Sequence, residues 1–230
     1  MCGKRVGVVI PAAGSGQRFG GDKILYPIYG RPLLYYTVRA FEMACTCHEI
    51  VLVVRKSILS PVRTLISNAG FSKVVDVVSG GKTRGESVRK GIEALSPGIG
   101  FFSIHDGARP LIQPEQIDQI HRMALEFGAV CAGHPLYDTV QLVDEEQKIC
   151  STPDRSQLMC ALTPQVFSRE IYEDALQKTR GREFSDDAGM VCAAGYSVRM
   201  AVCARSNLKV TEPDDITFAE MFLAGNKERN

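Results

Sequence analysis

The sequence predicts an α/β protein built on a mostly parallel, doubly wound sheet, and two observations lead to that prediction. Short apolar runs alternate along the chain with amphipathic helical patterns, and glycine-rich or charged loops follow the ends of the runs. Such alternation produces right-handed strand–helix–strand units. In sheets of this kind the ligand binds outside the carboxyl ends of the strands, so these loops are the candidate binding segments.

Five short runs are candidate strands. They contain many β-branched residues and are bounded by glycine, proline or charged residues, as expected of strands buried on both faces. The runs cover residues 6–10, 49–54, 73–78, 101–104 and 129–132, and a closing strand is expected at 198–202.

Helical patterns lie between these runs. The first begins at Pro32, which suits the first turn of a helix, and continues with apolar positions at helical spacing. Gly70 and Gly128 are expected to end two of the later helices. The remaining helices are expected over residues 58–69, 83–95, 114–127, 168–179 and 185–194, with a final helix from 213.

The alternation breaks after residue 134. Residues 136–143 and 148–152 flank the polar segment 144–147, which is typical of a β-hairpin. Because it interrupts the strand–helix rhythm, this hairpin is expected to project as an arm at about 136–155. The 230 residues otherwise fit a single domain spanning 1–230.

Composition excludes several classes of protein. Lysine and arginine number 27 against 26 acidic residues, and this net charge of +1 argues against a partner that is a nucleic acid polymer. No apolar run reaches the roughly 18 residues of a membrane span, and the first residues lack a signal-peptide pattern. We therefore expect a cytoplasmic protein with no membrane partner.

The eight cysteines are expected to be free thiols. Four of them, Cys131, Cys160, Cys192 and Cys203, lie in apolar stretches and are expected to pack as small hydrophobic side chains. Cys45 and Cys47 form the only cluster, with His48, and are expected at the end of a helix and in the loop that follows. No second pair completes a zinc site, so no metal ligands are assigned.

The loop 11–23 after the first strand is the strongest chemical signal. Its small residues allow close approach of a ligand to the backbone, and it carries two cations, Arg18 and Lys23. A dinucleotide fingerprint would need its third glycine one residue before Gly20, and an acidic residue where Arg55 stands. A Walker A loop would need a G-K-[ST] ending, which is absent. A triphosphate-binding loop outside both motifs is therefore preferred over a flexible turn.

Further polar segments interrupt apolar boundaries. They lie at residues 80–87, 105–110, 152–155, 161–165, 185–187 and 207–211. Each of them alone could be a helix cap or a local ion pair. For the segment 80–87, the alternative is that the paired glycines bring backbone groups to the edge of a nucleobase.

Taken together, the segments P-A-A-G-S-G-Q-R…K, G-G-K-T-R-G-E-S-V, H-D-G-A-R-P, D-T-V, A-L-T-P-Q-V-F, S-D-D-A and N-L-K-V-T-E-P-D-D form a specific pattern. In this order they resemble the 2-C-methyl-D-erythritol 4-phosphate cytidylyltransferase family of the bacterial and plastid non-mevalonate isoprenoid pathway. The resemblance runs from Val6 to about Leu223. It implies a Rossmann-like nucleotidyltransferase fold, CTP and Mg²⁺ as ligands, and a homodimer held by its β-arms.

The resemblance also implies roles for individual residues. Arg18 and Lys23 would stabilise the transition state, and Arg155 and Lys209 would position the second substrate. CTP would be bound by Ala12, Ala13, Gly14, Gly80, Gly81 and Ser87; the polyol phosphate would be bound by Asp106, Arg109, Thr139 and Thr163 as well. Thr139 and Arg155 lie on the arm and would reach the partner's site. The family usually has P-K-Q-Y-L around the lysine, whereas this chain has G-D-K-I-L.

The implied reaction transfers CMP from CTP to 2-C-methyl-D-erythritol 4-phosphate and releases pyrophosphate. The attacking phosphate oxygen is already anionic near neutral pH, so no general base is needed, and Mg²⁺ would be carried mainly by the CTP phosphates. One alternative is a cytidylyltransferase for another polyol phosphate such as ribitol 5-phosphate, whose loop usually reads L-A-G-G-x-G-T-R. A second is a catalytically inactive nucleotide-binding module, and a dehydrogenase is disfavoured by the glycine spacing.

Overall fold

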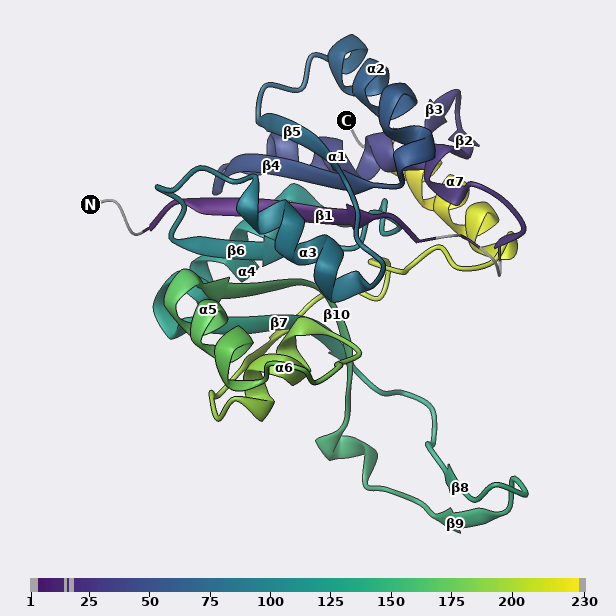
Figure 1. The fold of residues 1–230 in the computed structure, drawn as a ribbon. Coiled ribbons are helices and arrows are strands. Elements are labelled where there is room, and N and C mark those ends of the chain that lie inside the picture. Colours follow the sequence, from purple (N-terminus) through teal and green to yellow (C-terminus); the bar gives the residue numbers. More distant parts are fainter. Residues whose placement is uncertain (1–3, 15, 17–18, 228–230) are drawn as a thin grey trace.

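A central sheet of seven strands organises the protein, which a computed structural model describes over residues 4–14, 16 and 19–227 (Figure 1). The strand order is β11-β7-β10-β6-β1-β4-β5. The strands are β1 (Val6–Ala12), β4 (Cys47–Val54), β5 (Val74–Ser79), β6 (Phe101–Ile104), β7 (Ala129–Pro135), β10 (Met159–Ser168) and β11 (Arg199–Val202). All six expected strands are present, and most extend one to three residues beyond the predicted runs.

Strand directions confirm the mostly parallel sheet. β1 pairs in parallel with both β4 and β6, β4 with β5, and β7 with β11. The exception is β10, which runs antiparallel to both of its neighbours, β6 and β7. The carboxyl ends of the six parallel strands therefore meet at one edge, as the binding argument requires.

Within the described residues there are seven α-helices: six cover the two faces of the sheet, and α7 packs in a third apolar cluster with Ile28 and Leu33. They are α1 (Leu33–Met43), α2 (Leu59–Ala69), α3 (Arg84–Glu93), α4 (Pro114–Phe127), α5 (Arg169–Lys178), α6 (Asp187–Ala193) and α7 (Asp214–Lys227), with short 3-10 turns at Lys23–Leu25, Lys56–Ile58 and Arg155–Gln157. Gly70 ends α2 in the left-handed conformation and Gly128 ends α4, as predicted. Among the described residues, none of the helices combines the length and apolarity needed to cross a membrane.

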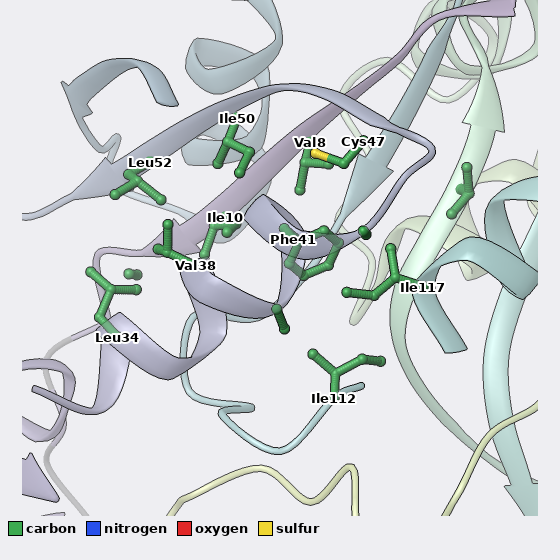
Figure 2. Packing of buried hydrophobic residues seen from close by; sticks show 14 of the residues in the cluster. Val8, Ile10, Leu34, Val38, Phe41, Cys47, Ile50, Leu52, Ile112 and Ile117 are labelled. Carbon is green, nitrogen blue, oxygen red and sulfur yellow. The ribbon is translucent and has the colours of Figure 1, made fainter. Parts of the chain in front are cut away.

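Two apolar cores show that the sheet is doubly wound. Val8 and Ile10 of β1 face a core formed with α1, α2 and α4, and Figure 2 shows Val38 and Phe41 of α1 packed there. Val9, between them in the sequence, faces the opposite core formed with α3, α5 and α6. Successive strand residues point to opposite faces, so every position of β1 except Pro11 is buried.

Helix α3 lies unusually close to the sheet at Gly91. A Cβ atom at this position would lie 2.3 Å from Cγ1 of Val9 and 2.8 Å from Cγ2 of Val53. We expect Gly91→Ala to lower the free energy of unfolding by about 1–3 kcal/mol, because α3 must move away from β1. Gly85→Ala, in the same helix, is the matched control: nothing lies within 4 Å of its Cβ position, so it should leave stability unchanged or raise it. Urea titrations of both variants measure the difference, and equal stabilities would contradict the close packing.

The predicted hairpin arm is present. Strands β8 (Leu142–Val143) and β9 (Ile149–Ser151) pair antiparallel as a separate two-stranded sheet, which projects well away from the central sheet (Figure 1). Leu142, Val143 and Ile149 are all more than half exposed. The chain enters the arm from β7 and leaves it into β10.

Four details differ from the sequence predictions. Strand β10 was not expected, and it is the longest strand of the sheet. Cys47 is the buried first residue of β4 and does not lie in a loop, whereas Cys192 is exposed and does not pack in the core. Pro32 is the N-cap of α1 and pairs in the small hairpin of β2 (Pro27–Ile28) and β3 (Arg31–Pro32), so the helix begins one residue later than predicted. The seven cysteines that the structure describes are free thiols.

Candidate active site

A cavity of about 420 Å³ opens at the carboxyl edge of the sheet. Four segments that are far apart in the sequence form its wall: the loop after β1, the turn that begins α3, the loop after β6, and the chain before α7. Their lining residues are Pro11, Ala12, Ala13, Gly14, Gly16, Lys23, Ile24, Gly81, Lys82, Thr83, Arg84, Ser87, Asp106, Gly107, Ala108, Lys209 and Thr211. Most of the predicted nucleotide residues therefore lie in one wall.

The loop after β1 brings Lys23 into the cavity. The Lys23 ammonium donates a hydrogen bond to the Val210 carbonyl at 2.9 Å, and Lys23 and Lys209 line the same cavity although they are far apart in the sequence. Asp22 forms an ion pair with Arg55 at 2.7 Å, so the loop is tied to the end of β4. Arg55 thus holds the loop through Asp22. In a dinucleotide-binding protein this position would carry the acidic residue that binds the ribose. Arg18 lies outside the described residues.

The turn at the start of α3 is held by its own hydroxyl groups. Ser87 Oγ accepts a hydrogen bond from the Gly81 amide and donates one to the Thr83 carbonyl, both at 3.0 Å. Thr83 caps the helix by accepting a hydrogen bond from the Glu86 amide. At Gly80, a Cβ atom would lie 2.6 Å from Cβ of Ala13. The two glycine-containing loops therefore touch, and only glycine fits where they meet.

Asp106 is the acidic residue of the cavity wall among the described residues, and three cations surround it. Lys209 lies 3.0 Å and Arg109 3.3 Å from its Oδ2, and Arg84 lies 4.0 Å from its Oδ1. Burial alone would raise the pKa of Asp106, but Lys209, Arg109 and Arg84 more than offset it and lower that pKa to about 2. Asp106 is therefore ionised throughout the physiological pH range.

Arg109 and Thr163 lie one layer behind Asp106 and are not part of the described cavity wall. Arg109 is only 7% exposed and also donates to the Asn207 carbonyl at 2.9 Å. Thr163 Oγ1 accepts a hydrogen bond from the Asp106 amide at 3.0 Å. Both side chains fix the orientation of the aspartate, which is an indirect way of serving a ligand.

Thr139 and Arg155 are exposed on the arm, outside the described cavity wall. The Arg155 guanidinium donates to the Tyr137 carbonyl at 2.7 Å across the base of the arm. Within one chain, the structure does not bring these two predicted residues together with Asp106 and Lys209.

Sequence reasoning missed Arg84. It is the first residue of α3 and lines the cavity, and its guanidinium donates to Asp187 Oδ2 at 2.6 Å. A cation at a helix N-terminus is unfavourable next to the helix dipole unless a carboxylate offsets it. An arginine in the first turn of a predicted helix was therefore the sequence feature that could have indicated Arg84. The carboxylate that offsets its charge is Asp187, from the S-D-D-A segment, to which no role had been assigned.

These features define a class of protein: a Rossmann-like nucleotide-binding protein, whose phosphate loop follows the first strand but matches neither the dinucleotide nor the Walker pattern. Comparisons with known proteins narrow this class. The family model for 2-C-methyl-D-erythritol 4-phosphate cytidylyltransferase matches residues 6–225. The chain belongs to this family, and it is a nucleotidyltransferase enzyme.

Relatives and solved structures support the same assignment. The 2-C-methyl-D-erythritol 4-phosphate cytidylyltransferase of Alkaliphilus metalliredigens is 36% identical over 97% of this chain and 95% of its own length. The 2-C-methyl-D-erythritol 4-phosphate cytidylyltransferase of a Synechococcus strain is 38% identical over 94% of this chain and 98% of its own length. The crystal structure of 4-diphosphocytidyl-2C-methyl-D-erythritol synthase from Anaerococcus prevotii superimposes with a TM-score of 0.85 at 26% identity, covering 96% of each chain. The crystal structure of the 2-C-methyl-D-erythritol 4-phosphate cytidylyltransferase from Thermus thermophilus superimposes with a TM-score of 0.78 at 29% identity. The match covers 96% of this chain and 99% of the Thermus chain.

Proposed function

We propose that this cavity transfers CMP from CTP to 2-C-methyl-D-erythritol 4-phosphate, giving 4-diphosphocytidyl-2-C-methyl-D-erythritol and pyrophosphate. The observation that carries the proposal is the meeting of two glycine-containing loops with Lys23, Lys209 and Asp106 around one cavity. A small-residue loop suits a triphosphate, and a carboxylate between cations suits a polyol that bears a phosphate.

The nucleotide side of the cavity would hold CTP. Ala12, Ala13 and Gly14 line it with backbone groups that a triphosphate can approach closely, and Gly80, Gly81 and Ser87 would read the cytosine edge. Lys23, with Arg18, would stabilise the negative charge that develops at the α-phosphate and on the leaving pyrophosphate.

The second side would hold the polyol phosphate. Asp106 would accept hydrogen bonds from its hydroxyl groups, while Arg109 holds the carboxylate from behind and Thr163 holds the Asp106 backbone amide. Lys209 would bind the phosphate and aim one of its oxygens at the α-phosphorus. No side chain has to remove a proton, because the phosphate is already an anion.

Mg²⁺ fits this scheme only as a nucleotide-borne ion. Among the described residues no group of three His, Cys, Asp or Glu side chains is placed to hold a metal. Asp106 is the carboxylate of the described cavity wall, and both of its oxygens face cations. We propose that the CTP phosphates carry the ion, whose charge offsets theirs.

Pyrophosphate release tests the reaction directly. The purified protein is incubated with CTP, UTP or ATP and with either 2-C-methyl-D-erythritol 4-phosphate or ribitol 5-phosphate. We expect turnover with CTP and the methylerythritol substrate. Turnover with ribitol 5-phosphate alone would support the other polyol specificity, and absence of turnover with intact CTP binding would support an inactive module.

We further propose that the enzyme is a homodimer in which each arm serves the partner's cavity. The arm leaves the carboxyl edge of the sheet, its apolar side chains are exposed, and a two-stranded hairpin alone is marginally stable in water. An isologous dimer would cover these side chains and would bring Thr139 and Arg155 to the partner's polyol phosphate. Arg155 could then bind the phosphate through two parallel hydrogen bonds.

Mixing two inactive variants tests the exchange of arms. If the arms cross, a mixed dimer of Lys23→Ala and Arg155→Ala chains has one site with both defects and one with neither. Random exchange would then restore about a quarter of the wild-type sites. Pyrophosphate release before and after subunit exchange measures the recovery. No recovery, with exchange verified by mass spectrometry of tagged chains, would mean that Arg155 serves its own subunit.

A further inference from the structure

Arg84 belongs by its backbone to the turn that would hold the nucleobase. It follows the capping residue Thr83 directly, and the next turn carries Ser87, whose hydroxyl binds both Gly81 and Thr83. The backbone of Arg84 is therefore part of this hydrogen-bonded turn.

The side chain of Arg84 leaves this turn and contacts two carboxylates, Asp187 and Asp106. Its guanidinium donates to Asp187 at 2.6 Å, and the other oxygen of Asp187 accepts from the hydroxyl of Tyr172 at 2.8 Å. Tyr172 is 1% exposed and packs in the core formed with α3, α5 and α6. This buried carboxylate anchors the guanidinium end of Arg84, so that movement of the helix turn alone shifts the rest of the side chain.

From that anchor, Arg84 faces Asp106. The Nε atom lies 4.0 Å from Oδ1 of Asp106, on the opposite side of the carboxylate from Lys209 and Arg109, which contact Oδ2. Among the described residues of the cavity wall, Arg84 therefore links two groups. Its backbone lies in the turn at residues 80–87, and its side chain pairs with Asp106.

We propose that Arg84 is a positioning residue that couples the two substrate sites: a nucleotide bound at residues 80–87 fixes the first turn of α3, and Arg84 then holds Asp106 ready for the polyol. This inference rests on the proposed function, and it predicts that each substrate tightens the binding of the other by the same factor.

Isothermal titration calorimetry measures the coupling without turnover. The α,β-methylene analogue of CTP is the nucleotide probe, and 2-C-methyl-D-erythritol 4-phosphate is titrated with and without it. In the wild type we expect the nucleotide to lower the Kd of the polyol phosphate about 5- to 150-fold, the usual range of such coupling. In Arg84→Gln this ratio should fall close to 1, while the nucleotide alone still binds.

Two further variants and one control complete the test. Asp187→Asn should lower the ratio with Arg84 present, because the anchor loses its charge, and Arg84→Lys should restore part of it. Arg89→Gln is the matched control, since Arg89 is an exposed arginine of the same helix outside the cavity wall. An unchanged ratio in Arg84→Gln or Asp187→Asn, or a wild-type ratio of 1, would overturn the coupling and leave the proposed function standing. Failure of the wild type to bind either ligand would overturn the proposed function itself.

Discussion

Replacing Lys23 by alanine is expected to lower kcat about 100- to 1,000-fold, the usual result of removing one donor that faces developing charge. The Lys23 ammonium lines the cavity and is held by the Val210 carbonyl, so it is positioned before substrate arrives. Negative charge on the leaving pyrophosphate grows only in the transition state. The Kd of CTP should therefore rise much less than kcat falls.

Steady-state kinetics and CTP titration separate these two effects. Lys56→Ala is the control, because Lys56 is an exposed lysine at the start of the 3-10 turn that follows β4 and is outside the cavity wall. It removes the same net charge and should keep wild-type turnover. A Lys23→Ala enzyme with near wild-type kcat would mean that the loop after β1 has been assigned the wrong lysine.

Stability is expected to fall steeply below pH 6.5 because two histidines are buried as neutral rings. Burial lowers the pKa of His121 to about 3, and burial together with Arg109 lowers the pKa of His105 to about 3. His121 lies between the hydroxyls of Ser103 and Thr46, at 2.9 Å and 2.8 Å. In the unfolded chain both rings take up protons near pH 6.5, so acid favours unfolding.

Each ring contributes a slope of up to about 1.4 kcal/mol per pH unit between pH 6.5 and 3, so the two together cost roughly 4 kcal/mol at pH 5. That is a large share of the ~5–15 kcal/mol of a typical domain. Asp106 affects stability only at lower pH. Its lowered pKa contributes to the free energy of unfolding at every pH above the ordinary aspartate pKa, and this contribution disappears only as pH falls toward 2. Its titration therefore does not obscure the histidine effect.

Urea titrations at pH 7.5, 6.0 and 5.0 measure this slope. His121→Asn should roughly halve it, whatever the variant's stability at pH 7.5, because one of the two titrating rings is gone. A free energy of unfolding that stays level between pH 7.5 and 5.0, or a His121→Asn slope equal to that of the wild type, would contradict the neutral burial of these rings.

The sequence predicted the parallel strands, the helices and the arm, because each has a periodicity or a breaker of its own. Strand β10 was not predicted because Pro164 lies in its middle, and proline is normally absent from central strands. The structure shows why it is tolerated here. Pairing of β10 with β7 is interrupted between Ala161 and Gln165, and pairing with β6 starts only at Gln165, so the missing amide of Pro164 costs no ladder hydrogen bond.

The sequence could predict which residues form the candidate site, but not which of them face the cavity and which lie behind it. Asp106, Arg109 and Thr163 all interrupt apolar boundaries, and nothing local shows that Asp106 faces the cavity while the other two stand behind it. That distinction depends on long-range contacts, such as the one between Arg109 and the Asn207 carbonyl. The assignment of functions to Arg18, Lys23, Arg155 and Lys209 stays a prediction until the variants are measured.

The reversal of β10 has a consequence for how the arm can change during evolution. Because β7 ends and β10 begins at the same edge of the sheet, the arm is an enlarged hairpin loop between neighbouring antiparallel strands. Closing such a loop costs only about 0.6 kcal/mol more for each doubling of its length. Insertions and deletions in residues 136–158 are therefore expected to change the stability of the central sheet little. The arm can lengthen, shorten or be exchanged between relatives while the catalytic core is kept, and its length is selected by what it must reach.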